Sequence, residues 1–344
     1  MQLSIMRVLN IGNAVEVFDI DLMDDEACLE LGYVVAKENV VLLRQAVSEQ
    51  RLYDIHMLWG SPYLGFILEP IIRRDVSGRH WRSVQASANR IGSKLDGHER
   101  NRGMARVSAQ QDKRGNPTGI FMNGELNWHA DLQTVFDVQK ITGLMSLWGT
   151  KNTQTAYLCT AAVYDVLSEE DRTMVDELIT ISRWDGGAMS RDLIESQLEI
   201  VRSQIVPIDG MECPLMMKTN AGRAGMRFPT HSFHGFKGMS QAESLKFRDH
   251  LWEQINKPEH IYVHDWEDGQ IMFMDQQITL HARPTAIKAG DERTLCRVPS
   301  YLDHLYPDYP AANYGFYDGE KLDRVELIAL ADETRKAEFN ANRR

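Results

Sequence analysis

The stretch Asn127-Trp128-His129-Ala130-Asp131 decides how the rest of this chain is interpreted. On an extended strand, residues two positions apart point to the same face, so His129 and Asp131 can reach one metal ion. A second histidine from another strand would complete a set of two imidazoles and one carboxylate, which leaves half of an Fe(II) coordination sphere open. The same alternation places Asn127 beside His129, where it could touch substrate, whereas Trp128 should fill the core.

The His-x-Asp pair alone is a weak indication of a metal site. With 11 His and 49 Asp+Glu in 344 residues, chance alone gives roughly 1.6 His-x-acid pairs. The interpretation therefore depends on residues farther along the chain. The second histidine is offered by Thr279-Leu280-His281.

The order of the motifs resembles the family of taurine and 2,4-dichlorophenoxyacetate dioxygenases, the TauD/TfdA type of Fe(II)- and 2-oxoglutarate-dependent oxygenase. The resemblance extends over most of the chain. In chain order, the matching stretches are Gly12–Leu22, Val40–Arg44, Asn127–Asp131, Gly238–Ser244, Trp266–Asp275 and Arg293–Arg297. The resemblance implies that His129, Asp131 and His281 are the metal ligands and the catalytic centre, and that the cofactors are Fe(II), the cosubstrate 2-oxoglutarate and O2.

Two arginines and a threonine are implied as the cosubstrate-binding residues. Arg293 matches the arginine that holds the far carboxylate of 2-oxoglutarate, for which a guanidinium fork is suited because it forms two parallel hydrogen bonds. Thr155 lies near the family's hydroxyl partner, although the glycine pair that precedes this position in the family is replaced here by Asn152-Thr153-Gln154. Arg297 matches an arginine that holds the cosubstrate or a substrate anion. The alternative for Arg297 is an ion pair with an acid at the barrel rim.

The expected reaction is hydroxylation of an unactivated C–H bond in a small, anionic or amino-acid-like metabolite or natural-product intermediate, with release of succinate and CO2. Related halogenases have a small residue in place of the carboxylate, so Asp131 argues against halogenation. Desaturation and epoxidation use the same oxidant and stay open. A cupin-like binding protein without turnover is a further alternative, and a zinc hydrolase would leave Arg293 unexplained.

The net charge of −11 is unevenly distributed. Residues 70–119 contain eleven Lys/Arg and four acids, so this segment carries +7. It is either a solvated loop or a lid that draws in an anionic substrate. In the second case the first residues to test are Arg73, Arg79, Arg82 and Arg90.

Composition excludes several other classes of protein. The four cysteines include no CxxC pair, which argues against a structural zinc site or a disulfide framework. No apolar stretch approaches the ~18–20 residues of a membrane span, so we expect a cytoplasmic protein without membrane contact. An acidic chain with few aromatic residues in its basic segment is also a poor match for nucleic acid. The expected partner is a small-molecule substrate, and a homo-oligomer stays open.

The remaining histidines and acids receive other roles. His231 and His234 are expected to be structural or to touch substrate, because a complete metal set exists elsewhere. His264 and Asp265 are expected on a surface turn, and Asp275 as a structural group near the site.

The fold expected is mixed α+β: a double-stranded β-helix, that is a cupin-like jelly-roll barrel, with flanking N-terminal helices and a mid-chain insertion. Helix starts are indicated at Ser48, at Ser168 and at Ser240, which forms a capping-box pattern with Glu243. We expect a single catalytic domain over 1–344. Its parts are an N-terminal layer (1–69), the basic loop or lid (70–119), barrel strands (120–160 and 260–303), an insertion (160–260) and a tail (304–344).

Overall fold

The computed structural model describes residues 6–61, 104–111, 113, 124–131, 141–182, 211–230, 233–288, 290–309, 314–317, 320–323, 325–326 and 329. Most of the basic segment 70–119 lies outside these residues. The predictions for Arg73, Arg79, Arg82, Arg90 and His231 therefore also lie outside the described residues.

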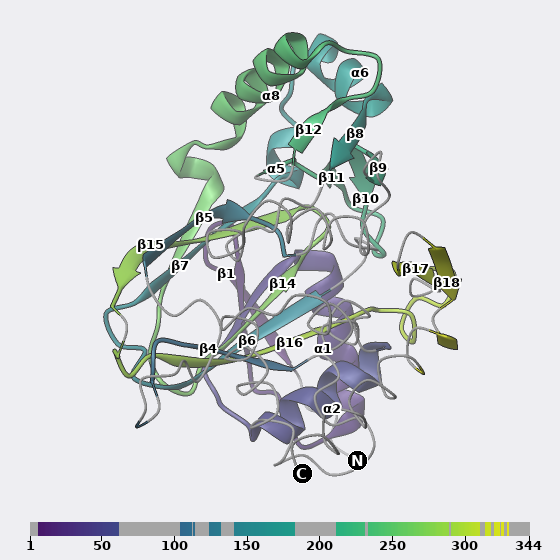
Figure 1. Ribbon diagram of the computed structural model, residues 1–344. Helices are drawn as coiled ribbons and strands as arrows, with labels where there is room; N and C mark the ends of the chain where they lie inside the picture. The colour runs from purple at the N-terminus through teal and green to yellow at the C-terminus, as the bar shows by residue number, and fades with distance from the viewer. Residues whose placement is uncertain are drawn as a thin grey trace, which may run out of the picture.

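Two sheets form the body of the molecule (Figure 1). The larger has the order β1-β2-β3-β14-β6-β16-β4, with bounds Arg7–Asn10, Val15–Phe18, Val40–Leu43, Ile271–Asp275, Ile141–Trp148, Thr294–Ser300 and Ala105–Ser108. The smaller has the order β13-β7-β15-β5, with bounds Ile261–Asp265, Gln154–Cys159, Thr279–Ile287 and Gly124–His129. Only the β2–β3 pair is parallel among the paired strands that the structure describes in these two sheets.

The central strands of the larger sheet are apolar on both faces because both faces are covered. In β3, Val41 and Leu43 pack in the cluster that the N-terminal helices share, whereas Val40 and Leu42 pack in a second cluster. Tyr157 of the smaller sheet joins this second cluster. The larger sheet therefore lies between the helices and the smaller sheet, and strands buried on both sides give continuous apolar runs.

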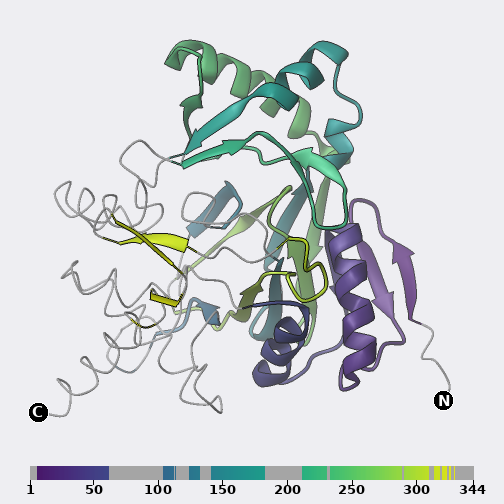
Figure 2. The same ribbon diagram turned by 90° about the vertical axis from the view of Figure 1, so that its right-hand side faces the viewer.

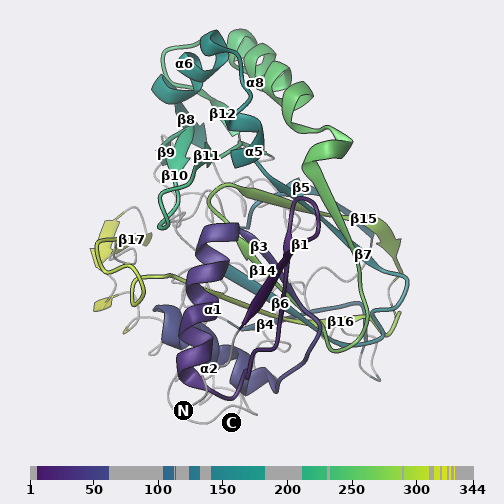
Figure 3. The ribbon, with the colours of Figure 1, turned by 180° about the vertical axis from the view of Figure 1, so that it is seen from behind.

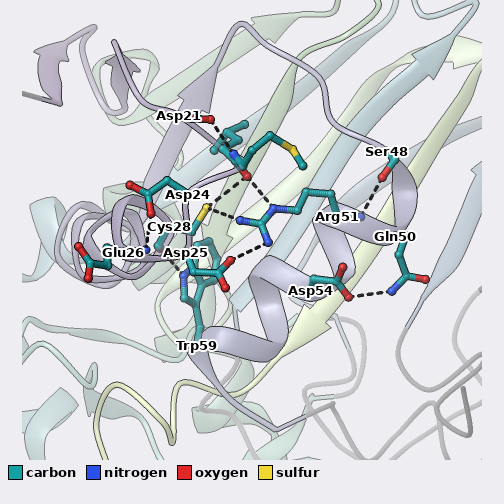
Figure 4. A network of polar contacts seen from close by, with 12 residues as sticks. Asp21, Asp24, Asp25, Glu26, Cys28, Ser48, Gln50, Arg51, Asp54 and Trp59 are labelled. Atoms are coloured by element: carbon teal, nitrogen blue, oxygen red, sulfur yellow. Dashed lines mark hydrogen bonds and ion pairs between the residues drawn. The ribbon is translucent and has the colours of Figure 1, made fainter. Parts of the chain in front are cut away.

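Helices α1 (Asp25–Glu38) and α2 (Glu49–Trp59) cover the outer face of the larger sheet (Figure 3). They are joined by the side chain of Arg51, whose Nε donates to Leu22 O at 2.6 Å and whose Nη1 donates to Asp25 Oδ1 at 2.8 Å (Figure 4). Trp59 Nε1 donates to Cys28 O at 2.7 Å. These contacts fix α2 against α1 and so position the helical layer.

The segment after β7 forms a lobe beyond the smaller sheet (Figures 1 and 2). It contains helices α5 (Ala161–Tyr164), α6 (Glu169–Glu177) and α8 (Gln241–Ile255), with the short helix η2 (Pro258–His260) leading back into β13. Its strands are β8 (Ile179–Ser182), β9 (Met211–Pro214), β12 (Phe233–Phe236), β10 (Met216–Lys218) and β11 (Ala224–Met226). Leu158 and Leu280 of the smaller sheet share an apolar cluster with Phe236 and Leu251 of the lobe. That residues 160–260 are an insertion within a single domain stays a proposal. The shared apolar cluster supports it.

Helix starts follow the expected caps. Ser48, Ser168 and Ser240 each accept a hydrogen bond from the backbone N–H three residues on, and Ser240 with Glu243 forms the complete capping box.

A hairpin of β17 (Tyr314–Tyr317) and β18 (Glu320–Asp323) comes last. The coarse prediction of a mixed α+β fold, rich in strands and with few helices, is confirmed. Among the helices that the structure describes, none has the length and apolarity to cross a membrane.

The prediction that His264 lies on a surface turn is wrong. His264 belongs to strand β13, pairs with Thr155 of β7 and is buried. Strand alternation turns His264 inward against the ring of Trp266 and leaves Asp265 exposed. The short strand ends in polar residues, which conceals its period of two in the sequence.

Candidate metal centre

The two strands β5 and β15 bring the three expected ligands together. They are neighbours in the smaller sheet, and His129 pairs directly with His281. Asp131 lies just after the end of β5. One ligand atom from each residue lies within 4.8 Å of the others, and Asp131 Oδ1 is 3.7 Å from His129 Nε2 and 3.9 Å from His281 Nε2. This is a compact set of two imidazoles and one carboxylate.

Neighbouring groups orient the first histidine and the carboxylate. Asn127 O accepts a hydrogen bond from His129 Nδ1 at 2.6 Å, which places the proton on Nδ1 and the lone pair of the neutral ring on Nε2. The backbone N–H of Asp131 donates to Gln276 Oε1 at 2.8 Å. Such supporting contacts are typical of metal ligands.

Arg297 holds the outer oxygen of the carboxylate. Its Nε and Nη2 donate to Asp131 Oδ2 at 2.9 and 2.6 Å, so that Oδ1 faces the histidines. Burial opposes the charge of Asp131, but Arg297 and the two histidines outweigh it and hold the pKa of this carboxyl well below its usual range. The carboxylate is therefore anionic, as a metal ligand must be.

The three residues face a cavity whose wall is part apolar and part cationic. Its apolar lining is Val107, Leu126, Leu144, Ala282 and Leu295. Its other lining residues, besides the three expected ligands, are Thr155, Arg283, Arg293 and Arg297. Both arginines expected from the sequence thus lie in one cavity with the triad.

Arg293 is a buried cation with unpaired nitrogen atoms. Arg293 is only 3% exposed. Its Nε and Nη1 have no hydrogen-bond partner in the described part of the chain. Burial, partly opposed by Tyr157, lowers the pKa of Arg293 to about 10, so the charge persists at neutral pH. A buried charge that lacks partners is costly, and an anionic ligand in the cavity would supply them.

Thr155 can act as a donor in the same cavity. Its Oγ1 accepts a hydrogen bond from Trp266 Nε1 at 2.8 Å, and both residues are buried. Because an indole N–H only donates, this contact does not use the hydroxyl proton of Thr155. The structure therefore brings Thr155, Arg293 and Arg297 to one cavity, while their roles stay predictions.

An ion pair with an acid was the alternative role expected for Arg297. The structure shows such a pair inside the cavity. Arg297 does pair with an acid, but that acid is Asp131 within the cavity, not a residue at a rim. Arg297 accordingly acts on the carboxylate of the candidate metal site. Contact with a cosubstrate or a substrate stays a prediction.

The expected orientation of Asn127 is wrong. Between the pairs His281↔His129 and Arg283↔Leu126, β5 contains one residue more than β15, which is a bulge. The bulge shifts the alternation, so Leu126 lines the cavity with His129 whereas Asn127 is exposed. Asn127 contributes its backbone carbonyl to His129 instead.

Among the described residues, His234, His56 and Asp275 are outside the group of three that could hold one metal ion. His234 is exposed on β12 in the lobe. His56 is buried beside Trp59 and Phe273, and burial, with Arg297, lowers its pKa to about 3. Burial raises the pKa of Asp275 to about 7, although Gln277 donates to both of its oxygens. As expected, Asp275 is outside the ligand set.

Arg283, Leu126 and Gln276 are among the residues of the site that were missed in the sequence. Arg283 stands two positions after His281, so strand alternation could have identified it. Leu126 and Gln276 gave no local signal, because one depends on the bulge and the other on a turn that approaches Asp131.

Comparison with known proteins agrees with this geometry. Residues 11–298 match the family described as taurine catabolism dioxygenase TauD, TfdA family. Pentalenolactone F synthase of Streptomyces arenae is 26% identical over 149 residues, or 41% of this chain and 50% of that protein. (S)-phenoxypropionate/alpha-ketoglutarate-dioxygenase of Sphingobium herbicidovorans is 24% identical over 169 residues, or 47% of this chain and 57% of that protein. The chain thus matches about half the length of these curated relatives.

A solved structure extends the likeness to the fold. The crystal structure of a taurine dioxygenase from Burkholderia xenovorans superimposes with a TM-score of 0.58 and 17% identity, over 95% of this chain and 98% of that chain. At this identity the likeness shows a shared fold alone.

Proposed function

The chain belongs to the TauD/TfdA family of dioxygenases, and we propose that it uses Fe(II), 2-oxoglutarate and O2 to oxidise a small molecule. The observation that carries the proposal is the meeting of two complementary features in one cavity. A set of two histidines and one carboxylate suits Fe(II), and the buried Arg293 with its unpaired nitrogen atoms suits a carboxylate. A ligand that binds metal at one end and presents a carboxylate at the other satisfies both.

The donor set fits the proposed metal. His129, Asp131 and His281 would hold Fe(II) from one side, with Asp131 using Oδ1 because Arg297 holds Oδ2. Arg293 and the hydroxyl of Thr155 would hold the far carboxylate of 2-oxoglutarate. When bound together, Fe(II), 2-oxoglutarate and O2 would oxidise an unactivated C–H bond of the substrate, with release of succinate and CO2.

The protein's own residues would position the ligands and exclude water from them. Gln276 fixes the backbone of Asp131, and Arg297 keeps its carboxylate ionised and oriented. The apolar side chains of Val107, Leu126 and Leu295 exclude water from the rest of the wall, which favours oxidation of the bound substrate over side reactions.

We assign hydroxylation as the reaction and a small, anionic or amino-acid-like molecule as the substrate. The positive charge of the cavity wall supports an anion, and the carboxylate of Asp131 argues against halogenation. Desaturation and epoxidation would use the same site.

We further propose that the two sheets are the halves of a double-stranded β-helix.

An anaerobic spectrum tests the proposal. Adding Fe(II) and 2-oxoglutarate to the folded protein without O2 should produce the visible charge-transfer band of an Fe(II)–2-oxoglutarate chelate. Omitting either component should abolish the band. A folded protein that gives no band would refute the proposed function, and binding of both without succinate formation across a wide substrate panel would favour a binding protein.

A further inference from the structure

The turn between β14 and β15 is built from buried polar side chains. Asp275, Gln276 and Gln277 follow one another along it, and all three are buried. Gln276 Nε2 and Gln277 Oε1 have no hydrogen-bond partner within the ranges that the structure describes. A buried polar atom without a partner costs free energy, and apolar side chains avoid this cost. A function of these polar side chains would account for their presence.

The carboxylate of Asp275 closes this turn around Gln276. Asp275 Oδ1 accepts a hydrogen bond from the backbone N–H of Gln277 at 2.5 Å, and Oδ2 accepts one from Gln277 Nε2 at 2.9 Å. A hydrogen bond from an aspartate to the N–H two residues on is an Asx turn, and it encloses the backbone of the residue between them. The closed turn therefore sets the direction in which the side chain of Gln276 leaves the backbone.

Gln276 extends from this turn to Asp131. Its Oε1 accepts a hydrogen bond from the backbone N–H of Asp131 at 2.8 Å. Strand β5 ends at His129, so Asp131 lies beyond the ladder of its own strand. Gln276 therefore fixes the main chain at Asp131, while Arg297 fixes the carboxylate.

A hairpin of the lobe reaches the same turn. Strands β10 and β11 lie on the side of the lobe that faces the two sheets (Figures 1 and 3), and Asn220 is buried in the turn between them. Asn220 Oδ1 accepts a hydrogen bond from Gln277 Nε2 at 3.0 Å. A Cβ at Gly225 of β11 would lie 3.0 Å from two carbon atoms of the Ile278 side chain. The hairpin is therefore packed tightly against the turn that supports Asp131.

We propose that Asp275 and Gln277, together with Asn220 of the lobe, are positioning residues for the metal site. They hold the turn closed around Gln276, and Gln276 in turn holds Asp131. The inference rests on the proposed function and extends the support of the metal site to a residue of the lobe. Contacts that orient metal ligands typically change metal affinity about 10- to 100-fold. Metal binding should therefore depend on Asp275, although Asp275 is outside the ligand set.

Titration of the folded protein with Mn(II), without cosubstrate, tests the inference. Asp275→Ala opens the turn around Gln276 and should weaken Mn(II) binding about 10-fold. Asp275→Asn keeps an acceptor for the backbone N–H of Gln277, so it should restore the affinity to within about threefold of the unsubstituted protein. Asn220→Leu removes the acceptor in the lobe and should weaken Mn(II) binding about threefold, as expected for the loss of one hydrogen bond.

A double-mutant cycle shows whether Asp275 acts through Gln276. Gln276→Leu removes the acceptor for the N–H of Asp131, so Asp275 then has no contact to position. Adding Asp275→Ala to Gln276→Leu should change the Mn(II) affinity by less than about twofold. Two independent structural effects would multiply instead. The matched control is Ser240→Ala, which removes the cap of helix α8 in the lobe and should lower stability while leaving the Mn(II) affinity unchanged.

Three results would overturn the inference and leave the proposed function standing. They are an unchanged Mn(II) affinity in Asp275→Ala or in Asn220→Leu, effects that multiply in the cycle, and a loss of affinity in Ser240→Ala as large as in Asn220→Leu. If Asp275→Ala fails to fold, Asn220→Leu and its own cycle with Gln276→Leu decide in the same way. Failure of the unsubstituted protein to bind Mn(II) would refute the proposed function and, with it, the inference.

Discussion

Replacing Arg293 by Met should weaken 2-oxoglutarate binding without lowering the stability of the fold. In the protein without ligands, Arg293 is buried, and its Nε and Nη1 make no hydrogen bond to any described residue. Methionine fills similar space without a charge. The substitution therefore removes a buried ion that has two nitrogen atoms without a hydrogen-bond partner among the described residues.

The size of both effects can be worked out from these two nitrogen atoms. Each charge-assisted hydrogen bond to a ligand carboxylate contributes about 1.5–3 kcal/mol, so losing two should cost about 3–6 kcal/mol of binding. This corresponds to a dissociation constant about 10²- to 10⁴-fold higher. The free energy of unfolding should stay equal or rise by about 1–4 kcal/mol, as when buried ions are replaced by apolar residues.

Urea denaturation of the ligand-free protein and calorimetric titration of the Mn(II) form with 2-oxoglutarate measure the two effects. The matched control is Arg51→Met, since Arg51 donates hydrogen bonds to Leu22, Asp25 and Cys28. It should lower the free energy of unfolding by about 1–3 kcal/mol and leave 2-oxoglutarate binding unchanged. A large loss of stability in Arg293→Met with unchanged 2-oxoglutarate affinity would refute the reasoning.

Three further predictions concern residues near the site. Gln276→Leu leaves the buried N–H of Asp131 without its acceptor, so urea denaturation should show a loss of about 1–3 kcal/mol and Mn(II) titration a weaker affinity; unchanged values would exclude the positioning role. His56 has a folded pKa of about 3 against 6.5 unfolded, so the unfolded state gains a proton first as pH falls, and stability should decline by up to about 1.4 kcal/mol per unit from pH 6.5 towards 3. His56→Asn should flatten that slope, and an unchanged slope would contradict the assignment. In Gly143→Ala the new Cβ would lie 2.5 Å from His56 Nε2 and 3.1 Å from Phe273, so denaturation should show a loss of about 1–3 kcal/mol, whereas a neutral substitution would mean that the core yields.

The sequence was sufficient where a signal is local. Ser240 and Glu243 specify a helix start within four residues, and the apolar run Val40–Leu43 specifies a strand buried on both faces. His129 and Asp131 were found because their spacing and the motifs around them are both readable along the chain.

The sequence was insufficient where two distant segments determine the outcome. The bulge that replaces Asn127 by Leu126 in the cavity exists only in the pairing of β5 with β15. The contact of Gln276 with Asp131 spans 145 residues and depends on how the β14–β15 turn approaches β5. His264 was misplaced because the strand that buries it is recognisable only beside β7.

The number of Fe(II) ions bound per chain, measured anaerobically, tests most directly whether His129, Asp131 and His281 form one metal site. The unsubstituted protein should bind one ion, and replacing any of the three by Ala should abolish binding while the chain stays folded. His234→Ala should retain the ion, because His234 is exposed in the lobe. Retention of a full complement of Fe(II) by any of the three triad variants, or its loss in His234→Ala, would contradict the site.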